Sequence, residues 1–95
     1  MSTLHIVNCS PRQGEVLRDA LAAMQPDDHL ILIEDAVYAL LDQTYLWPES
    51  RCHILQEDVN ARGLTDKAHA SACACVDIQG FVALACLCKR TVSWH

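Results

Sequence analysis

The chain has 95 residues, of which 52% are hydrophobic and 20% charged, and its formal net charge at pH 7 is −5. This length is typical of one domain, here residues 1–95, and the apolar content is enough for a core without metal or disulfide support. The Lys and Arg residues are scattered, and only Lys89 and Arg90 are adjacent. Without the basic stripe that replaces phosphate counterions, direct binding of nucleic acid is not expected.

No stretch approaches the roughly 18 apolar residues that a membrane-spanning helix needs. The first residues, Met1 to His5, have neither the basic region nor the apolar run of a signal peptide. We therefore expect a cytoplasmic protein without a membrane partner. Six cysteines are present, at positions 9, 52, 73, 75, 86 and 88. The reducing cytoplasm favours free thiols over disulfides.

Strand-like and helix-like segments alternate along the chain. Residues 29–33 are a continuous apolar run, which is typical of a strand covered on both faces. In the first helix-like segment the apolar residues recur on one face at a 3.6-residue period: Val16, Leu17, Ala20, Leu21 and Met24. We predict strands at residues 4–8, 29–33, 52–55 and 72–76, and helices at residues 14–24, 34–42, 57–61 and 78–88. A loop at 43–51, a polar connection at 65–71 and a tail at 89–95, which can add a short strand, complete the chain.

Four times an apolar strand is followed at once by an acidic or small polar residue. Such residues accept a free N–H at a helix start, so each transition predicts a helix N-cap. Repeated strand–helix units with right-handed crossovers predict a small α/β fold with a mostly parallel sheet of four to five strands and helices on both faces. The acidic residues at these transitions should gather at one sheet edge, as caps rather than as acid–base catalysts: Asp35, Glu57, Asp58 and Asp77.

Two close cysteine pairs, Cys73 with Cys75 and Cys86 with Cys88, suggest a four-thiolate metal site. Side chains two apart on a strand share a face, but two apart on a helix they diverge by about 200°. Both pairs therefore cannot converge on one ion, and we interpret these cysteines as small apolar core residues. The histidines show no clustering and no metal-binding spacing. We expect neither a metal nor a cofactor.

Cys9 is the candidate nucleophile. It ends the first predicted strand, just before a helix N-terminus, which is where open parallel sheets place their ligands. A helix N-terminus also lowers the pKa of a thiol. The alternative is an ordinary buried turn residue. Cys52, at the start of a strand, is expected to be structural.

Four segments of the chain form an ordered set of motifs: Leu4-His5-x-x-Asn8-x-Ser10-Pro11, Leu32-x-x-Asp35-x-Val37-Tyr38-Ala39, Leu55-x-Glu57-Asp58-x-x-Ala61-Arg62-Gly63-Leu64, and Val76-Asp77-x-x-x-Phe81-Val82-x-Leu84 with a later Ser93-Trp94. In their order and spacing these segments resemble the TusB/DsrH family of sulfur-relay proteins. The resemblance implies a DsrE-like fold and a dimer of heterotrimers, here with TusC-like and TusD-like subunits. Such complexes pass persulfide sulfur onward. In one branch it reaches the 2-thio group of the tRNA wobble uridine, and the other branch serves dissimilatory sulfur oxidation.

One position departs from the DsrH branch, whose members tend to carry a cysteine in the middle of the first helix. Here Ala20 aligns with that cysteine and supplies no thiolate. This favours a TusB-like structural subunit, with the working cysteine on a partner. The aromatic residues Tyr45, Trp47 and Trp94 then suit subunit contacts, or alternatively local packing. Two other hypotheses stay open: a sulfur carrier that uses Cys9, and a homo-oligomer whose Cys-rich segment, with Cys73, Cys75, Cys86 and Cys88, binds a soft metal.

Overall fold

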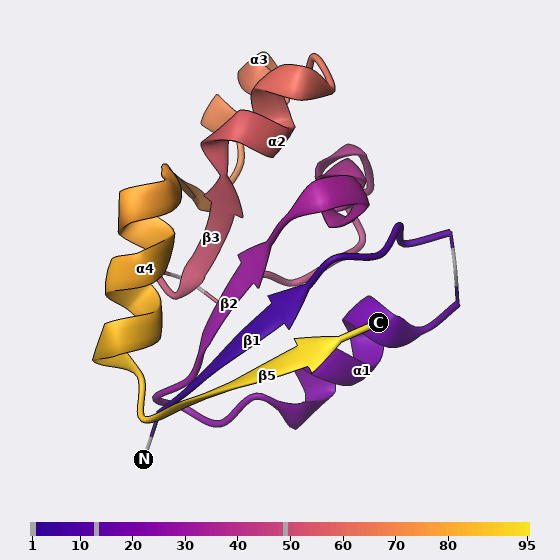
Figure 1. Ribbon diagram of the computed structural model, residues 1–95. Helices are drawn as coiled ribbons and strands as arrows, with labels where there is room; N and C mark the ends of the chain where they lie inside the picture. Colours follow the sequence, from indigo (N-terminus) through magenta and orange to yellow (C-terminus); the bar gives the residue numbers. More distant parts are fainter. Residues whose placement is uncertain (1, 13, 49) are drawn as a thin grey trace.

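The computed structural model describes residues 2–12, 14–48 and 50–95, and its centre is a parallel sheet of five strands (Figure 1). The strand order is β4-β3-β2-β1-β5, and all four pairings are parallel. The predicted parallel sheet is confirmed, and the tail supplies the fifth strand. The strands are β1 (Thr3–Val7), β2 (His29–Leu32), β3 (Cys52–Leu55), β4 (Ala74–Val76) and β5 (Arg90–Trp94).

Helices cover both faces of the sheet, but unequally. Four segments pack on one face: α1 (Val16–Ala23), the 3-10 helix η1 (Glu34–Leu41), α2 (Gln56–Ala61) and α3 (Thr65–His69). Among the helices in the described residues, only α4 (Ile78–Leu87) packs on the other face. From β1 to β4 each strand is added next to the previous one in a single direction across the sheet. After β4 the chain crosses back over β3, β2 and β1 to form β5 at the opposite edge. Right-handed crossovers in these two opposite directions put α4 on the face opposite the other helices.

β2 shows why the apolar run at 29–33 forms a central strand. Leu30 and Leu32 point into the larger core under α1 and η1, and Ile31 points into the smaller core under α4. All three are fully buried, because alternate side chains of a strand reach opposite faces. Within the described parts of the chain, no helix has the length and apolar character needed to cross a membrane.

The predicted N-caps are wrong for most of the transitions. In the part of the chain that the structure describes, Asp77 is the only one of the predicted N-caps that caps its own helix, by accepting a hydrogen bond from the Gly80 N–H at 2.8 Å. The η1 and α2 helices begin without a side-chain cap. The Glu34 N–H at the start of η1 instead donates to the carboxylate of Asp58, on α2, at 2.7 Å. Glu34 has a φ of +50°, so the chain turns sharply as it leaves β2, and the acceptor comes from the neighbouring strand–helix unit.

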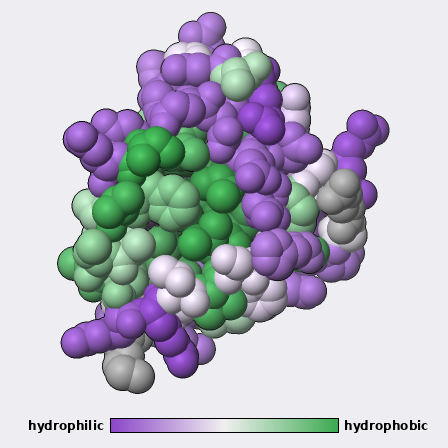
Figure 2. Space-filling view, viewed as in Figure 1, coloured by the Kyte–Doolittle hydropathy of each residue, from purple (hydrophilic) through white to green (hydrophobic). Residues whose placement is uncertain are grey.

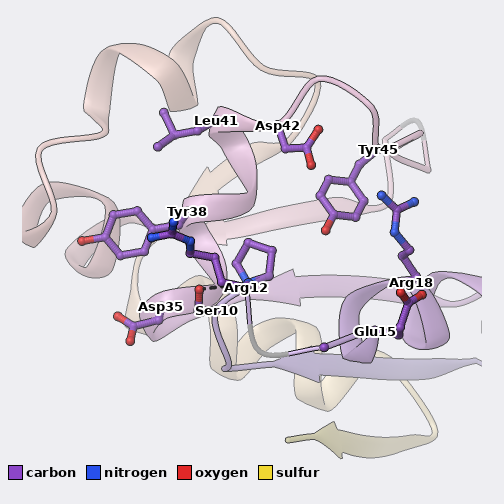
Figure 3. A pocket seen from close by; sticks show the side chains of 11 residues that line it. Ser10, Arg12, Glu15, Arg18, Asp35, Tyr38, Leu41, Asp42 and Tyr45 are labelled. Atoms are coloured by element: carbon purple, nitrogen blue, oxygen red, sulfur yellow. Dashed lines mark hydrogen bonds between the residues drawn. The ribbon is translucent and has the colours of Figure 1, made fainter.

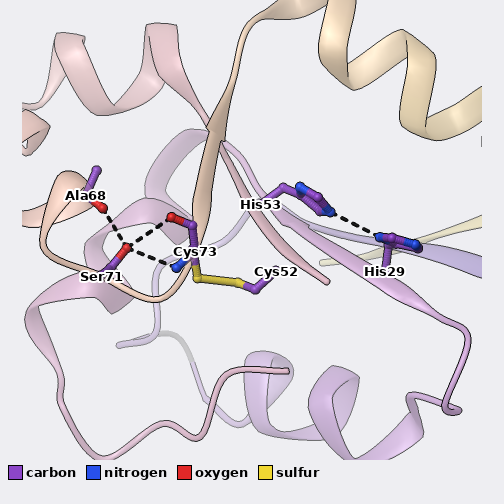
Figure 4. Close-up of a disulfide and its surroundings, with 6 residues drawn as sticks. All are labelled: His29, Cys52, His53, Ala68, Ser71 and Cys73. Atoms are coloured by element: carbon purple, nitrogen blue, oxygen red, sulfur yellow. Dashed lines mark hydrogen bonds between the residues drawn. A yellow bond between two sulfur atoms is a disulfide. The ribbon is translucent and has the colours of Figure 1, made fainter. Parts of the chain in front are cut away.

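The expectation of free thiols is wrong for one pair, because Cys52 and Cys73 form a disulfide (Figure 4). Pairing of His53 with Ala74 aligns β3 with β4 and brings the preceding residues, Cys52 and Cys73, opposite each other, with 4.8 Å between their Cα atoms. The hydroxyl of Ser71 shapes the approach to β4, since it donates to a carbonyl of α3 and accepts the Cys73 N–H.

The remaining late cysteines are spread over different surroundings. Cys75 is half-buried against the larger core, where burial raises the pKa of its thiol. Cys88 is buried in the smaller core under α4, and Cys86 is exposed. Because the 73/75 and 86/88 pairs reach different faces of the sheet, their placement agrees with the geometric argument against a four-thiolate site.

Candidate functional site

A cavity of about 720 Å³ opens at the carboxyl edge of the sheet, between the loop after β1 and η1 (Figure 3). We call it the carboxyl-edge pocket. Ser10 and Pro11 line it from the loop, Arg18 from α1, and Tyr38 from η1. Loops that leave the carboxyl ends of parallel strands commonly form ligand sites in α/β folds, and this pocket occupies such a position.

The pocket walls carry both signs of charge. Figure 3 shows Arg12 and Tyr38 toward one end, and Arg18 and Tyr45 toward the other. The Arg18 guanidinium lies 5.0 Å from the centre of the Tyr45 ring, a cation–π contact. Asp42 accepts hydrogen bonds from the hydroxyl and the N–H of Thr44, which lower the pKa of its carboxyl. The guanidinium and phenol groups can donate hydrogen bonds to an anionic group or to peptide carbonyls, and the carboxylates can accept them from peptide N–H groups.

Arg62 connects this pocket to α2. Its guanidinium contacts the carboxylates of Asp35, which lines the pocket, at 3.0 Å and of Asp58 at 3.4 Å. The hydrogen bond to Asp35 is the main reason why the pKa of Arg62 is raised. The predicted acidic group is thus divided: two of its members bind Arg62, Asp77 caps α4, and Glu57 is exposed. Sequence reasoning missed Arg62 as a site residue, although it lies in one of the family segments.

Cys9 is a free, half-buried cysteine that packs against the larger core beside the carboxyl-edge pocket. The next two residues, Ser10 and Pro11, line the pocket, but Cys9 does not. Ala20 lies on the inward face of α1 with no exposed surface. None of the described residues that line the pocket is a cysteine, so these residues offer no nucleophilic sulfur.

The prediction that the histidines do not cluster is wrong. His29 and His53 stack with ring centres 5.3 Å apart, and Nδ1 of His29 lies 3.1 Å from Nε2 of His53 (Figure 4). The β2–β3 register brings together two residues that are 24 positions apart in the chain. Burial and, to a smaller extent, the charge of His29 lower the pKa of His53. Among the described groups, Nδ1 of His53 is a buried polar atom without a hydrogen-bond partner.

Trp94 and the early aromatic pair make contacts within the chain. The Trp94 indole N–H donates to Nδ1 of His5 at 3.0 Å, and the side chain packs against the larger core. The Tyr45 and Trp47 rings lie 5.3 Å apart and pack against the same core. These contacts favour the local-packing alternative for all three residues.

The family model described as DsrH like protein matches residues 9–91. The matched segment begins at Cys9, includes the loop after β1 and Arg62, and ends within β5. No curated protein matches the chain. Members of the DsrH family act in sulfur relay within multi-subunit complexes. Because the match covers most of the sequence, this chain belongs to the DsrH-like protein family.

Proposed function

We propose that this chain is a structural subunit of a TusBCD-like complex, which relays persulfide sulfur toward 2-thiolation of the tRNA wobble uridine. In this proposal it assembles in the cytoplasm with TusC-like and TusD-like subunits into a heterotrimer that dimerises to a hexamer. The chain contributes a binding surface and support, and a cysteine of a partner carries the sulfur.

The proposal is supported mainly by one observation: none of the described residues that line the carboxyl-edge pocket has a thiol. A persulfide forms on a thiolate, so a subunit that carries sulfur needs a cysteine at its working surface. At the position where the DsrH branch tends to have one, this chain has Ala20, which is fully buried. The family membership and this missing nucleophile together support a subunit that assists the transfer.

The pocket walls suit a polypeptide segment of a partner. Arg12, Arg18, Tyr38 and Tyr45 offer hydrogen-bond donors and aromatic surface, and the carboxylates of Asp35 and Asp42 offer acceptors. A segment that carries a persulfide also carries peptide groups, which such mixed walls can bind. The net charge of −5 and the scattered cations leave contacts with the tRNA to other proteins of the pathway.

A second candidate function is a sulfur carrier that uses Cys9 itself. The specific observation in its favour is that Cys9 is free, half-buried and adjacent to Ser10 and Pro11 of the pocket. A small movement of the loop after β1 would expose the thiol to a donor. A DsrEFH-like role in sulfur oxidation shares the same family and would differ in the final acceptor.

The two candidates differ in where sulfur accumulates. Wild type, Cys9→Ser and a matched control, Cys86→Ser at an exposed thiol, would each be co-purified with TusC-like and TusD-like subunits and incubated with a low-molecular-weight persulfide. We expect intact-mass spectra to show an added sulfur atom on a partner only. Cells that lack this chain should also lose 2-thiouridine from tRNA, and Cys9→Ser should restore it.

If Cys9 formed a sulfur adduct and passed the sulfur to a thiol acceptor, this result would contradict the structural role and support the sulfur carrier. Unchanged 2-thiouridine together with impaired sulfur oxidation would assign the chain to the other branch. A chain that binds neither partner subunit in these preparations would contradict the proposal as a whole.

A further inference from the structure

The segment that contains α2 and α3, residues 56–69, is held to the rest of the chain by little apolar surface. We call it the α2–α3 unit. It buries Val59, Leu64 and Ala68 against the larger core, and its helices have only six and five residues. Figure 2 shows a largely hydrophilic surface over this unit, in contrast to the apolar surface over α4. Segments that bury little apolar surface open at a low cost in free energy.

The Cys52–Cys73 disulfide closes the α2–α3 unit into a ring. Cys52 is the first residue of β3, ahead of the unit, and Cys73 follows the unit, just before β4. Since β4 is an edge strand of three residues, the covalent bond is a large part of what fixes this end of the ring to the sheet. The two sulfur-bearing residues are not equally covered, because Cys73 is 6% exposed and Cys52 only 1%.

The ring supports one end of the carboxyl-edge pocket. Asp58 accepts the Glu34 N–H at 2.7 Å, and the Arg62 guanidinium contacts the Asp35 carboxylate at 3.0 Å and lies 6.0 Å from the centre of the Tyr38 ring. Glu34 has a φ of +50°, a left-handed conformation that residues other than glycine rarely adopt, so the start of η1 needs this outside support. Two pocket residues, Asp35 and Tyr38, are therefore positioned by a side chain of the ring.

The ring also reaches the other end of the pocket. A second cavity, of about 330 Å³, is lined by Lys67 of α3 and by Ser71 and Ala72, which lead to Cys73. Asp42 and Tyr45 line both this cavity and the carboxyl-edge pocket. A small thiol in the second cavity would thus lie next to the residue before Cys73, which carries the more exposed sulfur of the pair.

We propose that the Cys52–Cys73 pair is a redox switch of the carboxyl-edge pocket. In the disulfide form the closed ring holds Asp58 and Arg62 against η1, and the pocket walls are fixed. In the dithiol form the α2–α3 unit opens, and the wall at Asp35 and Tyr38 loses its support. The switch adds regulation to the proposed function, on which the use of the pocket by a partner segment rests.

Low-molecular-weight thiols of the glutathione type supply the electrons. A thiolate attacks Sγ of Cys73, the Sγ–Sγ bond breaks, and the sulfur of Cys52 leaves as a thiolate that takes up a proton. A second thiolate attacks the outer sulfur of the mixed disulfide, which releases the Cys73 thiol and a low-molecular-weight disulfide. The protein gains two electrons and two protons, and the two attacking thiols lose them. Burial raises the pKa of Cys75, the free thiol on the same sheet face, which keeps it protonated and out of this exchange.

A redox titration separates a switch from a purely structural disulfide. The full chain would be equilibrated at neutral pH with mixtures of reduced and oxidised glutathione, and alkylation followed by intact-mass measurement would count its free thiols. We expect the pair to be half reduced within the range of cytoplasmic glutathione poise, where structural disulfides stay oxidised. Cys75→Ser, the matched control, should have the same midpoint. A pair that stays oxidised, or stays reduced, over this whole range would overturn the proposal.

Hydrogen exchange of the full chain tests the link from the disulfide to the pocket. At exchange times too short for global unfolding, amides of η1 and of residues 56–69 should exchange about tenfold faster or more after reduction, while β1 and β2 stay protected. Arg62→Ala should speed exchange in η1 in the disulfide form and remove most of its response to reductant. Arg12→Ala, at an exposed arginine that lines the same pocket, should keep the wild-type response.

The wild-type comparison needs no variant, so it decides the matter even where a substitution unfolds the chain. Equal exchange of η1 in both redox states, or faster exchange confined to residues 56–69, would overturn the proposal. Loss of protection across the whole sheet would identify the bond as a general stabilising cross-link and overturn it as well. These measurements use the isolated chain without sulfur transfer, so their failure is distinct from a failure of the relay assays.

Discussion

Asp28 has an exposed fraction of only 2%, and its carboxylate joins three segments of the chain. It accepts hydrogen bonds from the N–H groups of Thr3 and Gln25 and from Nε2 of His5, each at 2.9 Å. Because Nδ1 of His5 accepts the Trp94 indole N–H, the proton of a neutral His5 lies on Nε2 and points to Asp28. Burial tends to raise the pKa of Asp28, but these hydrogen bonds together hold it below its usual value.

We predict that Asp28→Asn destabilises the protein at neutral pH by about 2 kcal/mol, because the amide cannot accept from all three donors. Because the pKa of Asp28 is lowered by folding, its carboxylate stabilises the protein fully at pH values above the pKa of an aspartate in the unfolded chain, about 3.9. This contribution is lost as the pH falls through the pKa of Asp28 in the folded protein. Urea unfolding should therefore show a smaller difference between variant and wild type at pH 3 than at pH 7. Asp27→Asn, at the exposed neighbouring position, is the control. A constant difference at both pH values would contradict the assignment.

At the scale of elements, the Cys52–Cys73 disulfide holds the α2–α3 unit to the sheet. The two cysteines are 21 positions apart, and the loop between them contains Asp58 and Arg62, which contact η1. We predict that Cys73→Ser lowers the free energy of unfolding by about 3 kcal/mol, since the unfolded chain regains the entropy of that loop. Cys75→Ser, on the same sheet face but with a free thiol, is the control. Dithiothreitol should reproduce the effect in the wild type and in Cys75→Ser, which both keep the disulfide, but not in Cys73→Ser. Equal stability of the wild type in the presence and absence of reductant would refute the prediction.

Structural features that depend on local sequence pattern could be predicted, whereas contacts that depend on the register between strands could not. The continuous run at 29–33 and the recurring strand–helix units were sufficient for a parallel α/β fold, because burial and crossover rules act along the chain. The His29–His53 pair, the disulfide and the Arg62–Asp35 contact join residues 21 to 27 positions apart. Composition and spacing do not indicate which residues lie opposite each other on neighbouring strands. For the same reason, the sequence did not indicate that Asp58 accepts the Glu34 N–H at the start of the neighbouring η1.

At the scale of the whole molecule, β5 is the edge strand next to β1, and its contacts bring together the two ends of the described chain. Its five residues pair in parallel with β1, and Trp94 reaches the Asp28 network through His5. The main-chain N–H of Lys89 also donates to the carbonyl of Ser2. These contacts span 87 to 89 positions, so they form only when most of the chain is in place. Without β5, β1 would become an edge strand with unpaired main-chain groups.

We therefore predict that a chain ending at Lys89 no longer unfolds cooperatively. It loses the β1–β5 pairing and the indole N–H that satisfies Nδ1 of His5, and it exposes the core side of β1 to water. Urea titration followed by far-ultraviolet circular dichroism should give a broad, shallow change in place of a sigmoidal transition. A chain ending at Trp94 keeps all five pairs and should retain the wild-type transition. If the chain ending at Lys89 unfolded in a sharp transition with the wild-type midpoint, β1 would not need its C-terminal neighbour, and the core would have to be stabilised by the β4-β3-β2-β1 portion alone.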